Sequence, residues 1–171
     1  MGTVVRELSV PNWFPAATAG ALPSFVEGTN FPVQSWAFDG GATDNIIYTK
    51  ITLLAYGSGD LTFNIHWQGD TATTGDVKWG IALAAITPNT DTQDVETKSF
   101  ATATTVVDTH LGTTAKRAHD IAITVTGASL DSVANGDELW IKLYRVASDT
   151  ANDTMAGYAK LLCAHMSYSD V

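Results

Sequence analysis

Alternation of apolar and polar residues is the feature that most limits the folds open to this chain. Between residues 61 and 68 the two kinds of side chain alternate without exception. A period of two places the apolar side chains on one face of an extended strand, whereas an amphipathic helix needs a period near 3.6. The same alternation recurs at residues 77–83, 121–125 and 139–143. The core of the protein is therefore expected to be β.

Shorter apolar runs predict further strands, at residues 4–10, around Trp36, and at residues 46–56, 101–109 and 158–168. Segments rich in Gly, Asp, Asn and Pro separate these runs and are typical of turns. About eight or nine strands without crossover helices predict an all-β fold, an antiparallel two-sheet sandwich. A jelly roll is the expected topology, and an immunoglobulin-like sandwich is the alternative.

The first 33 residues differ from the rest because prolines and glycines interrupt any long regular element. We therefore expect two parts: an extended Pro/aromatic N-terminal arm at residues 1–33 and the sandwich at residues 34–171. Apolar side chains of an arm must be covered, either by its own sandwich or by a neighbouring subunit, and the sequence leaves both open. A subunit interface would use the aromatic residues of the arm, namely Trp13, Phe14, Phe25 and Phe31.

Charge and cysteine content exclude several functions. The 171 residues carry 18 acidic and 9 basic side chains, and a net charge of −9 disfavours nucleic acid and anionic membranes as partners. The single Cys163 cannot form an intramolecular disulfide and, within an apolar run, is expected to be a small buried side chain. The first residues lack the basic and apolar regions of a signal peptide, so we expect synthesis and retention in a cytoplasm.

Motifs of catalysis are absent from the sequence. The four histidines have no HxH or HExxH spacing, and there is no nucleophile elbow, phosphate loop or Cys-x-x-Cys pair. No glutamate forms a recognisable glycosidase pair with a second carboxylate. We therefore expect no catalytic residues, no metal and no cofactor, and a surface or hydrogen-bonding role for each histidine.

Two features leave a binding function open. The loops at residues 89–94 and 149–153 offer oxygen ligands for calcium, although the same residues are common in ordinary turns, which we favour. Trp140 and Tyr144 lie on the polar face of their strand. They could stack on sugar rings or pack beneath a neighbouring layer, and packing is favoured.

The last third of the chain carries a longer pattern. A strand from Gly136 to Arg145 is followed by Asp149, then by Asp153-Thr154, and then by a final strand that ends near Tyr168. Arg145 at the end of its strand can reach the carboxylate of Asp149 or Asp153 across the loop. These three residues are therefore expected to form a structural pairing that holds the loop.

Upstream, a strand with Trp67 leads through a Gly-Asp loop into residues 77–79. Together with the C-terminal pattern it resembles the jelly-roll structural proteins of tailed-bacteriophage virions. The resemblance implies a non-enzymatic head decoration (cement) protein that binds the major capsid protein of a phage head and stabilises the capsid shell. It further implies a homo-oligomer, with a trimer favoured, located on the virion, and the aromatic residues of the arm would form the capsid or subunit interface.

Two other functions stay open. A glycan- or receptor-binding module of a tail or fibre protein, or of a carbohydrate enzyme, would use Trp140, Tyr144 or the loop aspartates. A jelly-roll hydrolase is the least favoured, because no acid, base or nucleophile can be named.

Overall fold

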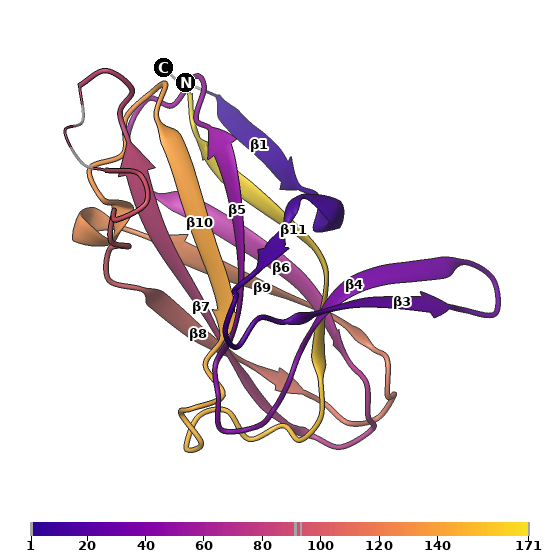
Figure 1. Ribbon diagram of the computed structural model, residues 1–171. Coiled ribbons are helices and arrows are strands. Elements are labelled where there is room, and N and C mark those ends of the chain that lie inside the picture. Colours follow the sequence, from indigo (N-terminus) through magenta and orange to yellow (C-terminus); the bar gives the residue numbers. More distant parts are fainter. Residues whose placement is uncertain (1, 91, 93, 171) are drawn as a thin grey trace.

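Two antiparallel β-sheets form the part of the chain that the structure describes, residues 2–90, 92 and 94–170 of a computed structural model (Figure 1). The expected all-β, two-sheet sandwich is thereby confirmed. The described residues contain two 3-10 turns, η1 (Val10–Asn12) and η2 (Gly127–Leu130), and no α-helix. Nor do they contain any helix with the length and apolar character that a membrane span requires.

The six-stranded sheet has the order β3-β4-β11-β6-β9, and β1 pairs with the remaining part of β11. Its strands are β1 (Thr3–Leu8), β3 (Leu22–Glu27), β4 (Pro32–Phe38), β6 (Leu61–Gly69), β9 (Ala118–Val125) and β11 (Ala159–Ser169). The five-stranded sheet has the order β2-β5-β10-β7-β8. Its strands are β2 (Phe14–Pro15), β5 (Asn45–Thr52), β7 (Gly75–Ile86), β8 (Thr104–His110) and β10 (Glu138–Arg145).

The core lies between the sheets and is built by the alternation seen in the sequence. Strand β6 sends four side chains inward, and all four are fully buried: Leu61, Phe63, Ile65 and Trp67. Strand β10 supplies Leu139, Ile141 and Leu143 from the opposite sheet. Aromatic rings from the two sheets pack against each other: the ring centroids of Trp67 on β6 and Trp79 on β7 lie 6.0 Å apart. The period of two therefore decides which side chains the sandwich buries.

Much of the segment expected to form an arm belongs to the sandwich. Strand β1 pairs along its length with β11, and Leu8, Val10 and Trp13 are buried in the core. The indole N–H of Trp13 donates to the carbonyl of Leu8, and that of Trp36 donates to the carbonyl of Val10. The prolines break the segment into short elements, and the apolar side chains between them still anchor it to the core.

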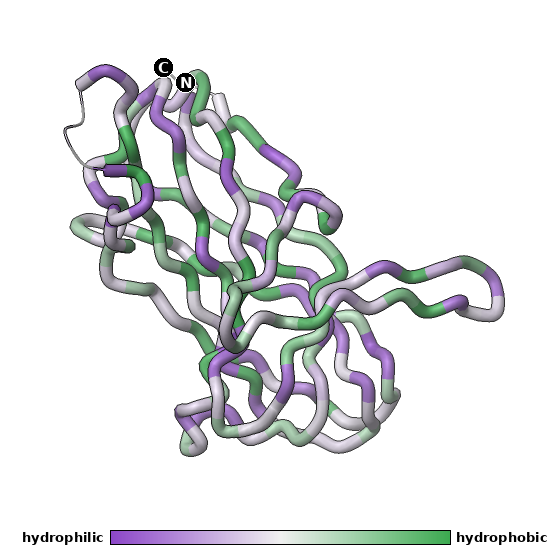
Figure 2. Tube along the Cα trace, in the orientation of Figure 1, coloured by the Kyte–Doolittle hydropathy of each residue, from purple (hydrophilic) through white to green (hydrophobic). Residues whose placement is uncertain are grey.

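The remaining part of that segment forms a hairpin that projects from the sandwich (Figure 1). Strand β3 pairs only with β4, and Phe25 and Phe31 are 70% and 69% exposed. Figure 2 shows hydrophobic residues on both strands of this hairpin. The sequence pattern does not predict β3, because Pro23 interrupts it, but a strand at the edge of a sheet tolerates a proline.

A buried ion pair closes one end of the sandwich. The guanidinium of Arg145 binds both carboxylate oxygens of Asp153, with Nη2 to Oδ1 at 2.6 Å, and both side chains are inaccessible to solvent. The same guanidinium donates to the carbonyls of Phe38, Met155 and Gly157. Arg145 therefore attaches the loop between β10 and β11 to the end of β4.

Candidate functional site

The outer face of the five-stranded sheet carries aromatic and charged side chains side by side. Because alternate residues of β5 and β10 face the core, Tyr48 and Lys50 of β5 and Trp140 of β10 face outward. The register places Trp140 directly between Lys50 on one side and Ala84 of β7 on the other. This face therefore presents the indole ring of Trp140 on the central strand of three, β5, β10 and β7.

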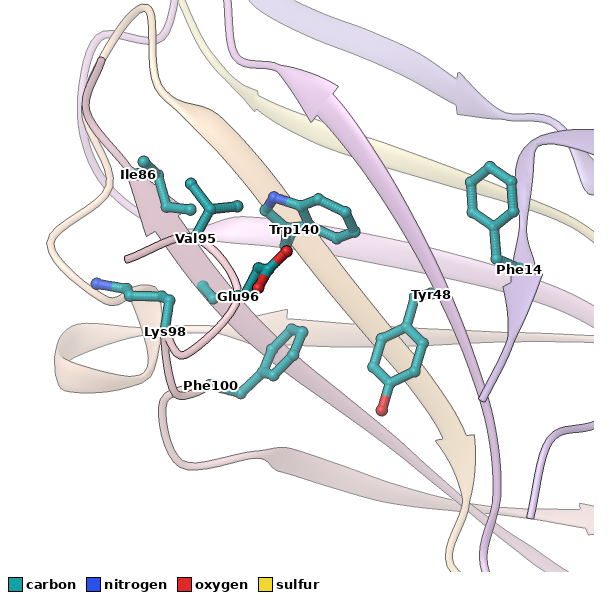
Figure 3. A pocket seen from close by; sticks show the side chains of 9 residues that line it. Phe14, Tyr48, Ile86, Val95, Glu96, Lys98, Phe100 and Trp140 are labelled. Carbon is teal, nitrogen blue, oxygen red and sulfur yellow. The ribbon is translucent and has the colours of Figure 1, made fainter. Parts of the chain in front are cut away.

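Tyr48 and Trp140 line a groove of about 460 Å³ (Figure 3). Its aromatic members come from three strands and from the loop that joins β7 to β8, and its charged members come from that loop. The lining residues are Phe14, Tyr48, Ala84, Ile86, Val95, Glu96, Lys98, Phe100 and Trp140.

Trp140 is held in place by its polar neighbours. Its indole N–H donates to Oε1 of Glu138 at 2.8 Å, and Oε2 of the same carboxylate accepts from Nζ of Lys50 at 3.1 Å. The Lys50 ammonium also lies 5.1 Å from the centre of the indole ring, within the range of a cation–π contact. The ring is therefore ordered before any ligand arrives, which reduces the entropy lost on binding.

A second aromatic pair forms the other part of the groove. The rings of Tyr48 and Phe100 are stacked, with centroids 5.7 Å apart and planes inclined by 30°. The loop that carries Phe100 is attached to the sheet because Ala101 donates its N–H to the carbonyl of Leu83 at 2.8 Å. Lys98 adds an ion pair with Asp131, 3.1 Å long and mostly shielded from solvent.

Small residues of β7 make room for the groove. Ala82 and Ala84 face outward from the sheet and are nevertheless buried by the side chains and loop above them. Further along, Gly80 lies beneath the ring of Tyr144, where a Cβ atom would come within 2.6 Å of Cζ. Tyr144 therefore packs flat on the sheet, whereas Trp140 lines the groove. Burial, followed by the charge of Asp44, raises the pKa of the Tyr144 hydroxyl, so Tyr144 is neutral at physiological pH.

The four aromatic residues expected at a subunit interface lie in three different places. Trp13 is buried in the core, and Phe14 is 60% exposed and lines the groove. Phe25 and Phe31 lie on the projecting hairpin. The structure therefore joins Phe14 to the groove and keeps the hairpin residues apart from it.

The residues of the expected loop pairing are divided between two ion pairs. Arg145 binds Asp153, whereas Asp149 binds Lys78, with Nζ to Oδ2 at 2.6 Å. Hydrogen bonds from Lys78 and Asn152 lower the pKa of Asp149. Both aspartates of this calcium candidate loop are thus engaged by cationic side chains. In the other candidate loop, Asp91 and Gln93 lie outside the described residues.

The histidines form two clusters that the sequence spacing does not reveal. His110 is fully buried, and its Nδ1 lies 2.9 Å from Nε2 of His119, whose ring stacks on Trp67. Burial lowers the pKa of His119, with His110 and Arg117 acting in the same direction and Asp108 opposing them. The other two histidines, His66 and His165, lie on the outer face of the six-stranded sheet.

Cys163 lies beside that second cluster and is half-buried, in contrast to the expected core position. Burial raises the pKa of its thiol, and the carboxylates of Glu7 and Asp120 act in the same direction. A register shift in β11 causes the difference, because it changes which side chains of the strand face the core.

Of the four aromatic residues in the groove, the sequence patterns did not single out Tyr48 and Phe100. For Tyr48 the signal was present, since the buried residues Ile47 and Thr49 on either side of it place it on the outer face. Phe100 lies outside any strand and carries no periodic signal. Its position depends on how the loop folds back over β7.

No protein-family model matches the chain, and no curated protein matches it either. Solved structures match it over nearly its whole length at low sequence identity. The CBM22-1 and GH10 modules of a Clostridium thermocellum endo-1,4-β-D-xylanase, complexed with xylohexaose, give a TM-score of 0.53 at 10% identity, over 97% of this chain and 28% of that chain.

Two isolated binding modules match along almost their full length. The carbohydrate-binding module TmCBM27, described with specific mannan recognition, gives a TM-score of 0.51 at 7% identity, over 99% of both chains. A family 11 carbohydrate-binding module from Clostridium thermocellum, in complex with a β-1,3-1,4-mixed-linked tetrasaccharide, gives 0.50 at 13% identity, over 95% of this chain and 94% of that chain. At such identities the similarity establishes the fold, a jelly-roll β-sandwich.

Proposed function

We propose that this protein is a non-catalytic module that binds a neutral polysaccharide in the groove on the outer face of the five-stranded sheet. The observation that carries the proposal is the row of aromatic rings at Phe14, Tyr48, Phe100 and Trp140 in one groove. Sugar rings have apolar C–H faces that stack on aromatic rings, and an aromatic side chain contributes a large contact area at low entropic cost.

The polar groups of the groove suit hydroxyl-rich ligands. Glu96 and Glu138 accept hydrogen bonds, and Lys50 and Lys98 donate them. Both ammonium groups are already paired with carboxylates, Lys50 with Glu138 and Lys98 with Asp131, so neither is free to bind the carboxylates or sulfates of a charged polymer, which favours an uncharged glycan.

The structural comparisons support the same class of ligand. The three matched structures are described with xylohexaose, with mannan and with a β-1,3-1,4-linked tetrasaccharide. All three ligands are oligosaccharides or polysaccharides rather than single sugars, and we therefore propose a polymer of neutral hexose or pentose units for this groove. Because one fold serves many functions, the aromatic groove of this chain carries the argument and the shared fold only supports it.

Isothermal titration calorimetry against xylan, mixed-linked β-glucan and glucomannan oligosaccharides tests the proposal. We expect the full chain to bind at least one of them, and Trp140→Ala to weaken that binding by about five- to thirtyfold, because a stacked ring contributes about 1–2 kcal/mol. Phe25→Ala is the control, since Phe25 is an exposed aromatic residue of the projecting hairpin and is not among the residues that line the groove. It should bind like the unchanged protein.

Two results would contradict the proposal. One is a complete lack of binding to every polymer of the panel by the folded protein. The other is an equal loss of binding in the Trp140→Ala and Phe25→Ala variants, which would place the glycan outside the groove.

A second candidate function rests on the projecting hairpin. Its exposed Phe25 and Phe31 form an apolar element away from the sandwich, and such elements commonly dock on another chain. This is the surface that a virion decoration protein, bound to a capsid shell or assembled as a trimer, would use. Light scattering of the full chain and of a Phe25→Ser, Phe31→Ser variant tests it: an oligomer that dissociates in the variant supports docking through the hairpin, and a monomer in both cases counts against self-assembly.

A further inference from the structure

Three metal-binding side chains lie together on the outer face of the six-stranded sheet, on the side of the sandwich opposite the aromatic groove. They are His66 of β6 and Cys163 and His165 of β11. One ligand atom from each residue lies within 4.8 Å of the ligand atoms of the other two. The two imidazole rings meet edge to face, with centroids 5.5 Å apart.

A β-bulge creates this arrangement. The register between β11 and β6 shifts between Leu161 and Cys163, so that Leu161 and Ala164 both face the core although they are three positions apart. After the bulge, Cys163 and His165 share the outer face. Cys163 then lies directly opposite His66 on the neighbouring strand.

The donor set matches one class of metal ion. A thiolate and two imidazoles suit Zn²⁺ and similar transition metals, whereas Ca²⁺ and Mg²⁺ require oxygen ligands. In a tetrahedral zinc site the ligand atoms lie about 3.3–3.7 Å apart. The side chains therefore need to approach one another by about 1 Å, and they are free to do so, because the His66 side chain is 40% exposed and Cys163 is half-buried.

Two carboxylates complete the surroundings of the cluster. Oδ1 of Asp120 on β9 lies 3.4 Å from Nε2 of His66, and Glu7 of β1 pairs in register with His165. Carboxylates next to metal-bound imidazoles orient the rings and balance the charge of the ion. The cluster is thus bordered by acidic groups on both sides, on strands that flank β6 and β11.

We propose that His66, Cys163 and His165 bind one Zn²⁺ ion per chain, with Asp120 or a water molecule as the fourth ligand. The ion would cross-link β6 and β11, two adjacent strands of the six-stranded sheet. Because it binds only where the strands are paired, it stabilises the folded state by an amount that grows with the logarithm of its concentration over the dissociation constant.

Calorimetric titration of the metal-free full chain with zinc chloride tests the site, and Co²⁺ replaces Zn²⁺ in a parallel absorption measurement. We expect one Zn²⁺ per chain and a sulfur-to-cobalt charge-transfer band. Cys163→Ala should abolish that band and, like His66→Gln and His165→Gln, weaken Zn²⁺ binding by at least about a hundredfold. Asp120→Asn should weaken it by about tenfold.

His119→Gln is the matched control, because it changes a histidine of the other cluster and should leave Zn²⁺ binding unchanged. The melting temperature of each variant in EDTA reports whether it folds, and the half-buried position of the cluster on the outer face of the sheet, outside the core, predicts that all do. The proposal is overturned if the folded chain takes up no Zn²⁺ at micromolar concentrations or half an ion per chain. A cobalt spectrum without the thiolate band, or an equal loss of binding in His119→Gln, would overturn it as well.

Discussion

At the scale of single residues, burial decides which polar contacts stabilise the fold. The side chains of Arg145 and Asp153 are both inaccessible to solvent. The guanidinium donates hydrogen bonds to the carboxylate and to three carbonyl groups. Lys78 and Asp149 form a similarly short ion pair, but their side chains are 20% and 28% exposed. Water and salt screen the second pair and leave the first unscreened, so the two pairs should differ strongly when one partner is removed.

Arg145→Met is therefore expected to lower the free energy of unfolding by about 3–5 kcal/mol, because Asp153 would remain buried without a partner. Lys78→Met should cost about 1 kcal/mol or less. Urea denaturation followed by tryptophan fluorescence measures both. The double variant Arg145→Met, Asp153→Leu should regain part of the loss, and equal costs for the two single variants would contradict the assignment.

His119 should make the stability of the fold depend on pH. Its pKa lies below the ordinary value of 6.5, mainly because of burial, so the unfolded chain binds a proton more readily than the folded one. The free energy of unfolding contributed by this group is constant above the unfolded pKa and falls as the pH drops below it. Melting temperatures between about pH 7.5 and pH 5.5 should fall more steeply in the unchanged protein than in His119→Gln; parallel curves would contradict this.

At the scale of elements, the N-terminal strands differ in how far they depend on the sandwich. Strand β1 pairs with β11 and buries Leu8, whereas β3 pairs only with β4 and leaves Leu22 58% exposed. The sequence predicted a strand at residues 4–10 and none at residues 22–27, but it placed both segments in one extended arm, because prolines and glycines interrupt the whole region. The two strands differ in their pairing partner, which is β11 for β1 and β4 for β3.

The two leucines give a matched test. Leu8→Ala should destabilise the protein by about 2–5 kcal/mol, since it leaves a cavity in the core. Leu22→Ala should change stability by about 0.5 kcal/mol or less, because the side chain is already in contact with water. Thermal or urea unfolding of both variants checks this, and a near-zero effect of Leu8→Ala would mean that β1 is not part of the cooperative unit.

At the scale of the whole molecule, the two proposed binding sites lie on the outer faces of opposite sheets. The aromatic groove belongs to β2, β5, β10 and β7, and the His66, Cys163, His165 cluster belongs to β6 and β11. The closely packed core between them has no described polar connection from one site to the other. Two sites are coupled only if binding of one ligand changes the contacts that the protein makes with the other ligand.

We therefore expect Zn²⁺ and glycan to bind independently. The dissociation constant for the best oligosaccharide should agree within about twofold in the presence of saturating Zn²⁺ and of EDTA. Calorimetry under the two conditions measures it. A larger change would show that the sandwich transmits strain from one sheet to the other.

The sequence alone determined which residues form most strands and which side chains of each strand face the core. The alternation of β6 and β10 is a local property, because a period of two follows from the geometry of one extended chain. For the same reason the sequence indicated that Trp140 faces outward, and the short loop after β10 indicated that Arg145 at the strand end has an acidic partner there. The sequence left open which aspartate that partner is.

Only the tertiary structure decided which strands became neighbours and therefore which side chains met. The pairing of β5 with β10, the loop that brings Phe100 onto Tyr48, and the bulge that turns Cys163 toward His66 all join residues far apart in the chain. Such contacts arise from long-range packing and register, which no local pattern specifies. Both proposed sites are assembled in this way, and neither could be located before the sheets were formed.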